Sequence, residues 1–412
     1  MPERFTGLLR LRPAFARLWL GQAVSALGDQ IFTVAIAVLV VTRLRGSATD
    51  LGIVLGARVL AAALFVIAGG VWSDRLRRTR LMIGTDVVRG AAVFALAATP
   101  TSFPPAALAA MTFVLGSGES FFRPAYRSLV PDLVDRSQLP EANALTTITL
   151  RTASLVGPGI AGLIVSIASV RWALWADVAT FLVSSVTLAT ISDQPVSTGP
   201  RRSALVEARE GFRAIRRRSW AAALLVADLL LMLFAVAPWT VLLPVVALHR
   251  LGGSRSYGLI LSLFAAGGIC GALVAVRWHP RRPGLAALLC QATFAGCLVS
   301  LAWFSEPAVA VLAVVAGAGT EIYGILWTSA LQRAFERDLL GRVMAISSLG
   351  SLAFAPLGMA LAGPAASALG TRAVLLFGAG VLACCTAGLI AVPGVSRLGE
   401  HVQRDVAAAA VD

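Results

Sequence analysis

Charged side chains within long apolar stretches are the residues of this sequence most able to do chemistry. They are Asp29, Arg58, Asp86, Arg89, Glu119, Arg123, Arg151, Asp177, Asp228 and Glu321. A charge at the centre of a membrane helix costs at least about 2.5–3.5 kcal/mol, so each of these residues needs a partner or a function. A carboxylate in a low-dielectric cavity can take up and release a proton, and a nearby arginine can alternate as its partner. Each of these residues is therefore a candidate either for such chemistry or for structural pairing with an opposite charge.

The elements that hold these charges are apolar helices. Hydrophobic residues make up 58% of the 412 residues and charged residues only 14%, whereas a soluble domain has about 25% charged residues. The apolar residues come in blocks of about 20, the length that crosses the hydrocarbon core of a bilayer as a helix. Twelve spans are predicted, at about 16–42, 50–72, 81–99, 105–126, 143–168, 172–191, 220–247, 256–277, 284–303, 307–331, 342–365 and 371–393. The fold class is an all-α membrane protein.

The composition argues against an enzyme. All 35 basic residues are arginine, so the chain has neither the lysine of a P-loop nor a Schiff-base lysine. Its three histidines, His249, His279 and His401, lie outside the spans and form no HExxH motif, and no nucleophile motif is present. No catalytic residue, metal site or cofactor is predicted.

Arginine placement orients the spans. Arginines concentrate in the N-terminal segment, at 75–80, at 127 and 136, at 201–218, at 277–282, at 333–342 and in the tail. The other side holds Arg43, Arg45, Arg171, Arg250, Arg255 and Arg372. By the positive-inside rule, both termini are cytoplasmic and the protein spans the cytoplasmic membrane. The net charge of +14 then belongs to loops at the membrane surface, and nucleic acid is not an expected partner.

The longest loop divides the spans six and six. The predicted parts are a six-helix bundle at 1–192, a linker at 193–219, a second six-helix bundle at 220–395 and a cytoplasmic tail at 396–412. Residues 204–218 pattern as an amphipathic helix, either on the anionic inner surface of the membrane or as a solvated linker. Gly157-Pro158 in the fifth span is matched by Ala355-Pro356 in the eleventh. Two related six-helix halves around a central cavity are typical of a transporter.

The loop after the second span carries the first motif, at residues 69–78. It holds Gly70, then Asp74-Arg75, then a basic cluster that includes Arg78. This resembles the cytoplasmic signature of the major facilitator superfamily, although Arg77 stands where that signature usually has glycine. The resemblance implies a latch in which Gly70 allows close helix packing while Asp74, Arg75 and Arg78 join and release helix ends. The alternative is that these arginines only set the topology.

The fifth span carries the second motif, Gly157-Pro158 with Gly162. It is similar to the antiporter motif found on this helix in the exporters of the superfamily. Proline frees a backbone carbonyl, and small residues allow tight packing. The resemblance favours export. The alternative is an ordinary kinked packing helix.

Further stretches resemble the drug:proton antiporter-3 group, which includes macrolide and siderophore exporters. They lie at 18–29, 121–125, 138–145, 326–332 and 341–343. The resemblance implies the major facilitator fold, with two pseudo-symmetric six-helix bundles, and a transport function. It does not imply a substrate.

In that superfamily, the first, fourth, seventh and tenth helices usually line the cavity. The resemblance therefore implies these candidates for proton coupling: Asp29, Glu119, Arg123, Asp228 and Glu321. Structural pairing is the alternative for each of them. Asp86 and Arg89, three residues apart, are expected to satisfy each other, and Asp177 is expected to have a packing role.

Aromatic and sulfur-containing side chains on the same helices are candidates for the substrate cavity. They are Phe121, Phe122, Met232, Phe234, Trp239, Tyr323 and Trp327. A large and mostly apolar pocket suits amphipathic or aromatic compounds. Packing, or anchoring at the membrane interface, is the alternative.

The sequence thus predicts a monomeric, proton-coupled secondary transporter in the lipid bilayer. Its partners would be protons and a small hydrophobic or amphipathic molecule, such as an antibiotic, a siderophore or a related metabolite, exported by alternating access. A lipid or lysophospholipid flippase of the same fold is the alternative within transport. A membrane sensor without transport activity is a weaker one.

Overall fold

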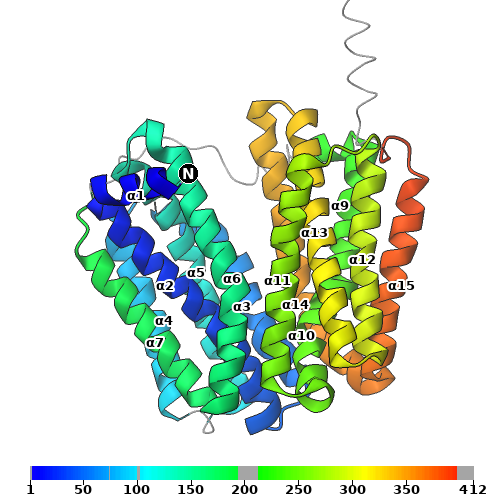
Figure 1. The fold of residues 1–412 in the computed structure, drawn as a ribbon, viewed down its shortest axis with the longest axis horizontal. Coiled ribbons are helices and arrows are strands. Elements are labelled where there is room, and N and C mark those ends of the chain that lie inside the picture. Colours follow the sequence, from blue (N-terminus) through cyan, green and yellow to red (C-terminus); the bar gives the residue numbers. More distant parts are fainter. Residues whose placement is uncertain (1, 74, 100–102, 194–211, 397–412) are drawn as a thin grey trace, which may run out of the picture. The chain divides into compact units, whose positions relative to one another are not determined.

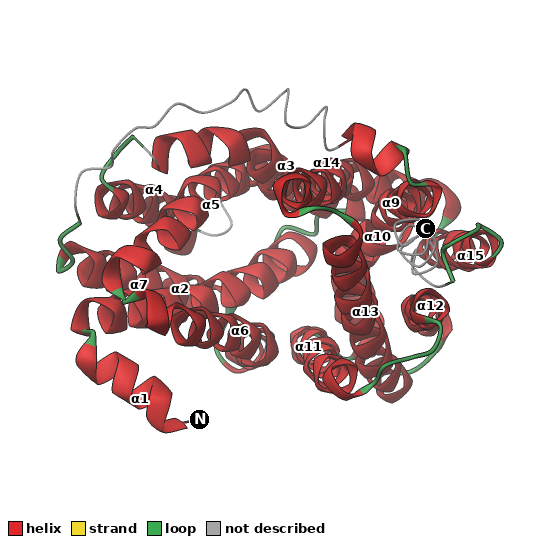
Figure 2. Ribbon diagram, turned by 90° about the horizontal axis from the view of Figure 1, so that it is seen from above, coloured by secondary structure: helices red, strands yellow, loops and turns green. Residues whose placement is uncertain are grey.

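The computed structural model describes residues 2–73, 75–99, 103–193 and 212–396. The secondary structure of these residues is helical, with no strand among them (Figures 1 and 2). A buried helix satisfies its backbone hydrogen bonds internally, as the hydrocarbon of a membrane requires.

The N-terminal helices include one that the sequence did not predict. This is α1 (Pro2–Leu11), which packs through Leu8 on α2 and α6. The others are α2 (Pro13–Val38) with its π-helical continuation η1 (Leu39–Arg43), α3 (Ala48–Ser73), α4 (Arg78–Ala98), α5 (Pro105–Leu133), η2 (Arg136–Gln138), α6 (Leu139–Ile167) and α7 (Val170–Ala189).

The C-terminal helices correspond to the later predicted spans. They are α9 (Ser219–Leu231), η3 (Met232–Val236), α10 (Ala237–Val246) and η4 (Ala247–Leu251), then α11 (Ser254–Arg277), α12 (Pro283–Trp303), α13 (Glu306–Ala334), α14 (Arg337–Leu369) and α15 (Thr371–Ile390). The predicted seventh span is one continuous helical run from α9 to η4. Two of its segments, η3 in the middle and η4 at the end, are π-helical. Gly252, with φ of 113°, ends this run and lets the chain turn into α11.

Ten helical runs in the described part of the chain are long and apolar enough to cross a membrane. The remaining two predicted spans are α5, whose apolar content is lowered by Glu119 and neighbouring serines, and α14, whose apolar part is Ala353–Leu369. At 29 and 33 residues, both exceed the ~20 residues that a crossing needs. Both also extend past the predicted spans, because a helix can continue where its sequence is no longer apolar.

The chain forms two compact units. The first is Met1–Gly199 with Pro244–Ser262, and the second is Pro200–Leu243 with Leu263–Asp412. The first unit thus includes a segment of the predicted second bundle. The predicted amphipathic helix at 204–218 and the tail lie mostly outside the described residues.

Small residues bring the helices of the first unit together. α3 packs along α5, and α2 lies against α6 and α7. A Cβ at Gly116 would meet the backbone of Arg58, and one at Gly69 would meet the carbonyl of Ser120. Close packing of this kind holds membrane helices together where the hydrophobic effect cannot.

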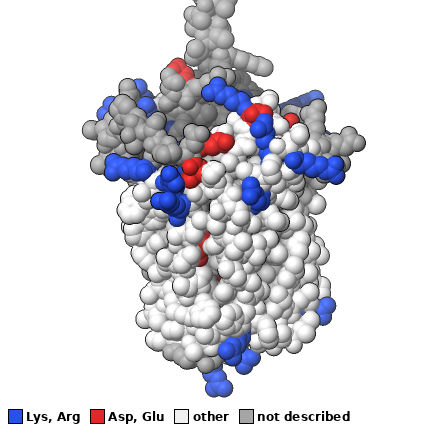
Figure 3. All heavy atoms as spheres, turned by 90° about the vertical axis from the view of Figure 1, so that its left-hand side faces the viewer, with Lys and Arg blue, Asp and Glu red and all other residues white. Residues whose placement is uncertain are grey.

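Figure 3 shows a face of the first unit. Charged side chains gather toward its ends, and a broad band between them is almost free of charge. The chain is a multi-pass membrane protein, and this band is the surface that hydrocarbon covers.

Candidate functional site

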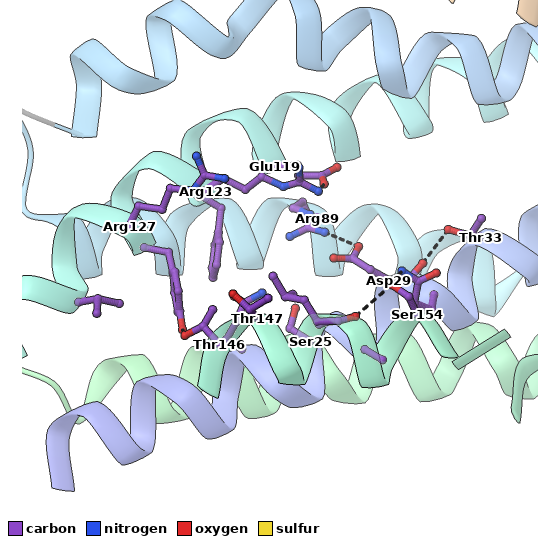
Figure 4. Close-up of a pocket in the computed structure, with 18 of the residues that line it drawn as sticks. Ser25, Asp29, Thr33, Arg89, Glu119, Arg123, Arg127, Thr146, Thr147 and Ser154 are labelled. Carbon is purple, nitrogen blue, oxygen red and sulfur yellow. Dashed lines mark hydrogen bonds and ion pairs between the residues drawn. The ribbon is translucent and has the colours of Figure 1, made fainter. Parts of the chain in front are cut away.

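Asp29, near the middle of α2, binds two arginines. Its carboxylate accepts a hydrogen bond of 2.6 Å from Arg89 of α4 and one of 2.9 Å from Arg58 of α3. Figure 4 shows Arg89 and Asp29 pointing toward each other. Three helices therefore meet at one carboxylate.

Arg58 reaches a second carboxylate as well. Its guanidinium lies 3.4 Å from Glu119 of α5, and Glu119 also pairs with Arg123 one turn along the same helix. The side chains alternate in charge in the order Arg89, Asp29, Arg58, Glu119, Arg123, and we call them the ion-pair chain. Because Arg58 bridges both carboxylates, it can shift between them without leaving the site.

Arg89 is the anchor of the ion-pair chain. Its side chain is 2% exposed and lies over the ring of Phe181 at 4.6 Å. It is 3.8 Å from Asp86, which instead accepts a 2.6 Å hydrogen bond from Ser184. The expectation that Asp86 and Arg89 satisfy each other therefore describes only the weaker contact, since Arg89 mainly binds Asp29.

Glycines make room for these charges. A Cβ at Gly118 would collide with the stem of Arg89, and a Cβ at Gly28 would collide with Thr180 and Asp177. Asp177 is buried on α7 beside Thr180, which donates a 3.3 Å hydrogen bond to its carboxylate. The glycines explain how long polar side chains fit between packed membrane helices.

The ion-pair chain lines a cavity of about 580 Å³ in the first unit. Polar side chains from α2, α5 and α6 line much of the wall, among them Gln30 and Asn143. Ser25, Thr33, Arg127, Thr146, Thr147 and Ser154 belong to the same set (Figure 4). Tyr126 and Thr146 share a 3.1 Å hydrogen bond, and Gln30 donates one of 3.3 Å to Ser154. The cavity can offer hydrogen bonds and charge to a solute.

The predicted cavity residues Phe121 and Phe122 point in different directions. Phe122 is buried and lines this cavity. Phe121 lines a separate groove instead, where its ring packs 5.5 Å from that of Trp72 and 6.1 Å from that of Phe65. Adjacent residues of a helix point about 100° apart, so only one of the pair can face the cavity.

In the second unit, Asp228 has a neutral partner. The hydroxyl of Tyr323 on α13 donates a 2.5 Å hydrogen bond to the carboxylate of Asp228 on α9. Among the described residues, no arginine pairs with Asp228. Glu321 lies two residues before Tyr323 on α13, and its carboxylate lies near Gly268 of α11. The structure thus places Asp228 and Tyr323 together and Glu321 apart from them.

The other cavity candidates of the second unit sit in aromatic packing. Trp239 packs against Phe264 and Phe294, with ring centroids 5.1 and 5.8 Å apart. The remaining contacts are Phe234 with Phe377 at 5.5 Å and Trp327 with Trp220 at 6.1 Å. Met232 begins the π-helical segment η3.

The residues of the predicted latch differ in their contacts. Arg78 pairs with Asp132 and donates a 2.9 Å hydrogen bond to the carbonyl of Ser128, so it joins α4 to α5. Arg75 is exposed, and Asp74 lies outside the described residues. A Cβ at Gly70 would meet nothing within 4 Å. The close approach expected of Gly70 is therefore made by its neighbour Gly69.

The Gly157-Pro158 motif packs closely. Helix α6 continues through Pro158. A Cβ at Gly157 would collide with Gln30, and one at Gly162 would collide with the backbone of Ser254. Its small residues therefore serve close packing within the first unit.

The sequence did not place Arg58 and Arg89 in the cavity, and it did not identify two carboxylates, Asp132 and Asp193, that hold helix ends. Arg58 had no predicted partner, and Arg89 was expected to pair with Asp86 on its own helix. Asp132 binds Arg78, and Asp193 accepts 2.9 Å hydrogen bonds from the backbone and hydroxyl of Thr79 at the start of α4. The signal available for Arg58 and Arg89 was the need of a buried arginine for a carboxylate on another helix.

The sequence profile of the Major Facilitator Superfamily matches residues 18–352. The chain belongs to the major facilitator superfamily. It is thus a membrane transporter of small molecules and not an enzyme, with the twelve-helix fold of that superfamily.

Relatives within the superfamily include efflux proteins. The chain is 25% identical to macrolide efflux protein A of Streptococcus pyogenes, over 90% of this chain and 93% of that protein. It is 27% identical to the enterobactin exporter EntS of Shigella boydii, over 86% of each chain. The nucleoside transporter NupG has a similar structure, with a TM-score of 0.73 at 12% identity, covering 92% of this chain and 98% of that one. At that identity, the likeness to NupG concerns the fold.

Proposed function

We propose that this superfamily member exports a small hydrophobic or amphipathic compound by alternating access, in exchange for protons, with both termini in the cytoplasm. The carrying observation is Arg58, which lies within reach of both Asp29 and Glu119 in the cavity of the first unit. When one of two carboxylates that share a basic group is neutralised, the basic group can move to the carboxylate that is still charged.

The exchange proceeds through the ion-pair chain. When a proton binds Glu119, that carboxylate loses its hold on Arg58, and Arg58 binds Asp29 alone. When the proton leaves, Arg58 is shared again. Arg58 itself stays protonated, because guanidinium does not release its proton in proteins. Protons are therefore carried by the carboxylates. Arg58 changes its ion pairs when a carboxylate gains or loses a proton, and these ion pairs join α2, α3 and α5.

The cavity wall supports an amphipathic cargo. Arg58, Arg89, Arg123 and Arg127 contribute four positive charges, and Asp29 and Glu119 contribute two negative ones. Phe122, Val130 and Leu150 add apolar surface. A compound with an apolar body and an acceptor or anionic group would satisfy this wall. The likeness to macrolide and enterobactin exporters supports the same class of cargo.

The test is uptake into inverted membrane vesicles with an acidic interior, using a macrolide, enterobactin and a fluorescent lysophospholipid as probes. Wild-type protein should accumulate a macrolide or enterobactin, and a protonophore should abolish this uptake. Asp29→Asn should reduce it to the level of vesicles without the protein.

Asp50→Asn is the matched control, because Asp50 lies outside the cavity, where Ser47 donates a hydrogen bond to it. Asp50→Asn should transport like the wild type. Full gradient-driven uptake by Asp29→Asn would refute its role in coupling. Movement of lysophospholipid alone would favour a flippase instead.

A further inference from the structure

A second hollow of the first unit lies away from the ion-pair chain. It is a groove of about 750 Å³ between the end of α3, the first half of α4 and the middle of α5. We call it the α3–α5 groove. Its apolar wall includes Trp72, Val88, Phe113, Val114 and Phe121.

One end of the α3–α5 groove is strongly basic. Arg75, Arg77 and Arg80 line it and are exposed. Arg78, in the same run, pairs with Asp132. By contrast, no carboxylate of the described residues pairs with the other three arginines. Three guanidinium groups without a carboxylate partner among the described residues thus stand at the mouth of an apolar groove.

The wall below these arginines faces outward. The residues Trp72 and Val88 are each 53% exposed although they belong to membrane-spanning helices. Gly84 lines the groove beside open space, since a Cβ built there would meet nothing within 4 Å. An exposed apolar wall on such a helix is covered by lipid chains in a membrane.

We propose that the α3–α5 groove binds an anionic phospholipid. The phosphate would lie among Arg75, Arg77 and Arg80, because guanidinium groups match phosphate oxygens in geometry and charge. The acyl chains would run along Trp72, Val88 and Phe121. Charge complementarity selects this occupant, since the cytoplasmic leaflet supplies anionic headgroups. The site goes beyond the proposed transport function, and it shares no residue with the ion-pair chain.

The first experiment measures lipid binding to the purified full-length protein by native mass spectrometry. The probes are phosphatidylglycerol and phosphatidylcholine with identical chains. Phosphatidylglycerol should bind more tightly. Replacing all three arginines by glutamine (Arg75→Gln, Arg77→Gln, Arg80→Gln) should weaken its binding on the order of a hundredfold, since each basic residue near a lipid surface contributes about one kcal/mol. Phosphatidylcholine should be affected much less.

Matched controls separate the groove from general attraction between charges. The triple variant Arg136→Gln, Arg281→Gln and Arg282→Gln removes the same charge from exposed arginines that line no hollow described here. It should bind phosphatidylglycerol like the wild type. An equal loss in this control would overturn the proposal, as would equal binding of the two lipids by the wild type.

The second experiment fills the groove and keeps its arginines. Gly84→Leu places a side chain into open space on α4, so the variant should fold. Its binding of phosphatidylglycerol should fall several-fold. Gly380→Leu is the control, because Gly380 is also open but lies outside the groove, on α15. Unchanged binding by folded Gly84→Leu would show that the lipid does not occupy the α3–α5 groove.

Discussion

Asp29 and Asp228 are both aspartates within membrane helices, one in each compact unit, yet their surroundings are opposite. Asp29 touches two arginines, and one of these also serves Glu119. Asp228 accepts a single hydrogen bond from the neutral Tyr323. Protonating Asp29 therefore costs ion pairs, whereas Asp228 can gain a proton without breaking one. The same residue type thus holds two ion pairs in one unit and accepts a single hydrogen bond from a neutral group in the other.

The strongest test of this difference is Arg89→Gln. Removal of one partner from a buried ion pair costs about 3–5 kcal/mol, and Arg89 has its binding partner on another helix. We expect a decrease of that size in the free energy of unfolding, measured by SDS titration of the purified protein. Arg136→Gln, at an exposed arginine, should leave the unfolding free energy unchanged within about 0.5 kcal/mol. Similar losses in the two variants would mean that the ion-pair chain does not stabilise the first unit.

The next test compares the two aspartates directly. Asp29→Asn removes the shared counter-ion of Arg58 and Arg89 but keeps a side-chain oxygen that can accept their hydrogen bonds, so it should cost about 1–3 kcal/mol of unfolding free energy. Asp228→Asn keeps an acceptor for the hydroxyl of Tyr323 and should cost less than about 1 kcal/mol. Both values come from the same unfolding titration. Reversal of this order would contradict the distinction between the two sites.

Tyr323→Phe tests the hydrogen bond between Tyr323 and Asp228 by itself. Loss of the hydroxyl removes one hydrogen bond, which contributes about 0.5–1.5 kcal/mol. The loss should shrink when Asp228→Asn is already present, because the two residues contact each other. Additive effects in this double-mutant cycle would show that the 2.5 Å hydrogen bond does not couple them.

The smallest effect is expected for Arg123→Gln. The side chain of Arg123 is 70% exposed, and exposed ion pairs contribute only about 0–1 kcal/mol. Stability should therefore change little, although the cavity loses one positive charge. Unfolding titrations and vesicle uptake of the two efflux probes would separate these effects. A stability loss as large as that of Arg89→Gln would show that Arg123 is part of the buried anchor.

The fold could be predicted from the sequence because apolar blocks indicate the membrane spans and arginine placement indicates where the spans end. The ion-pair chain did not, since its contacts depend on the rotation of each helix about its axis. A helix that is apolar on several faces does not fix that rotation by its own pattern. Phe121 and Phe122 illustrate this, since one lines the groove and the other the cavity. Gly69 and Gly70 show the same limit, because only Gly69 touches the neighbouring helix.

The short helix α1 escaped prediction for a different reason. It has ten residues and is too short to register as a span. Its burial depends on Leu8 meeting a core built mostly from α2, α5 and α6. Such a contact is a property of the assembled unit and is not visible in the local sequence.

The charges of the ion-pair chain also have an electrical consequence. The ion-pair chain has three arginines and two carboxylates, so its net charge is one positive charge when both carboxylates are ionised. If the cavity opens to each side of the membrane in turn, this charge experiences part of the transmembrane voltage, which is worth about 2.3 kcal/mol per elementary charge per 100 mV. A bound anionic group would cancel that charge, and a bound proton would double it. Voltage, as well as the proton gradient, would then set how fast the loaded and empty cavities reorient.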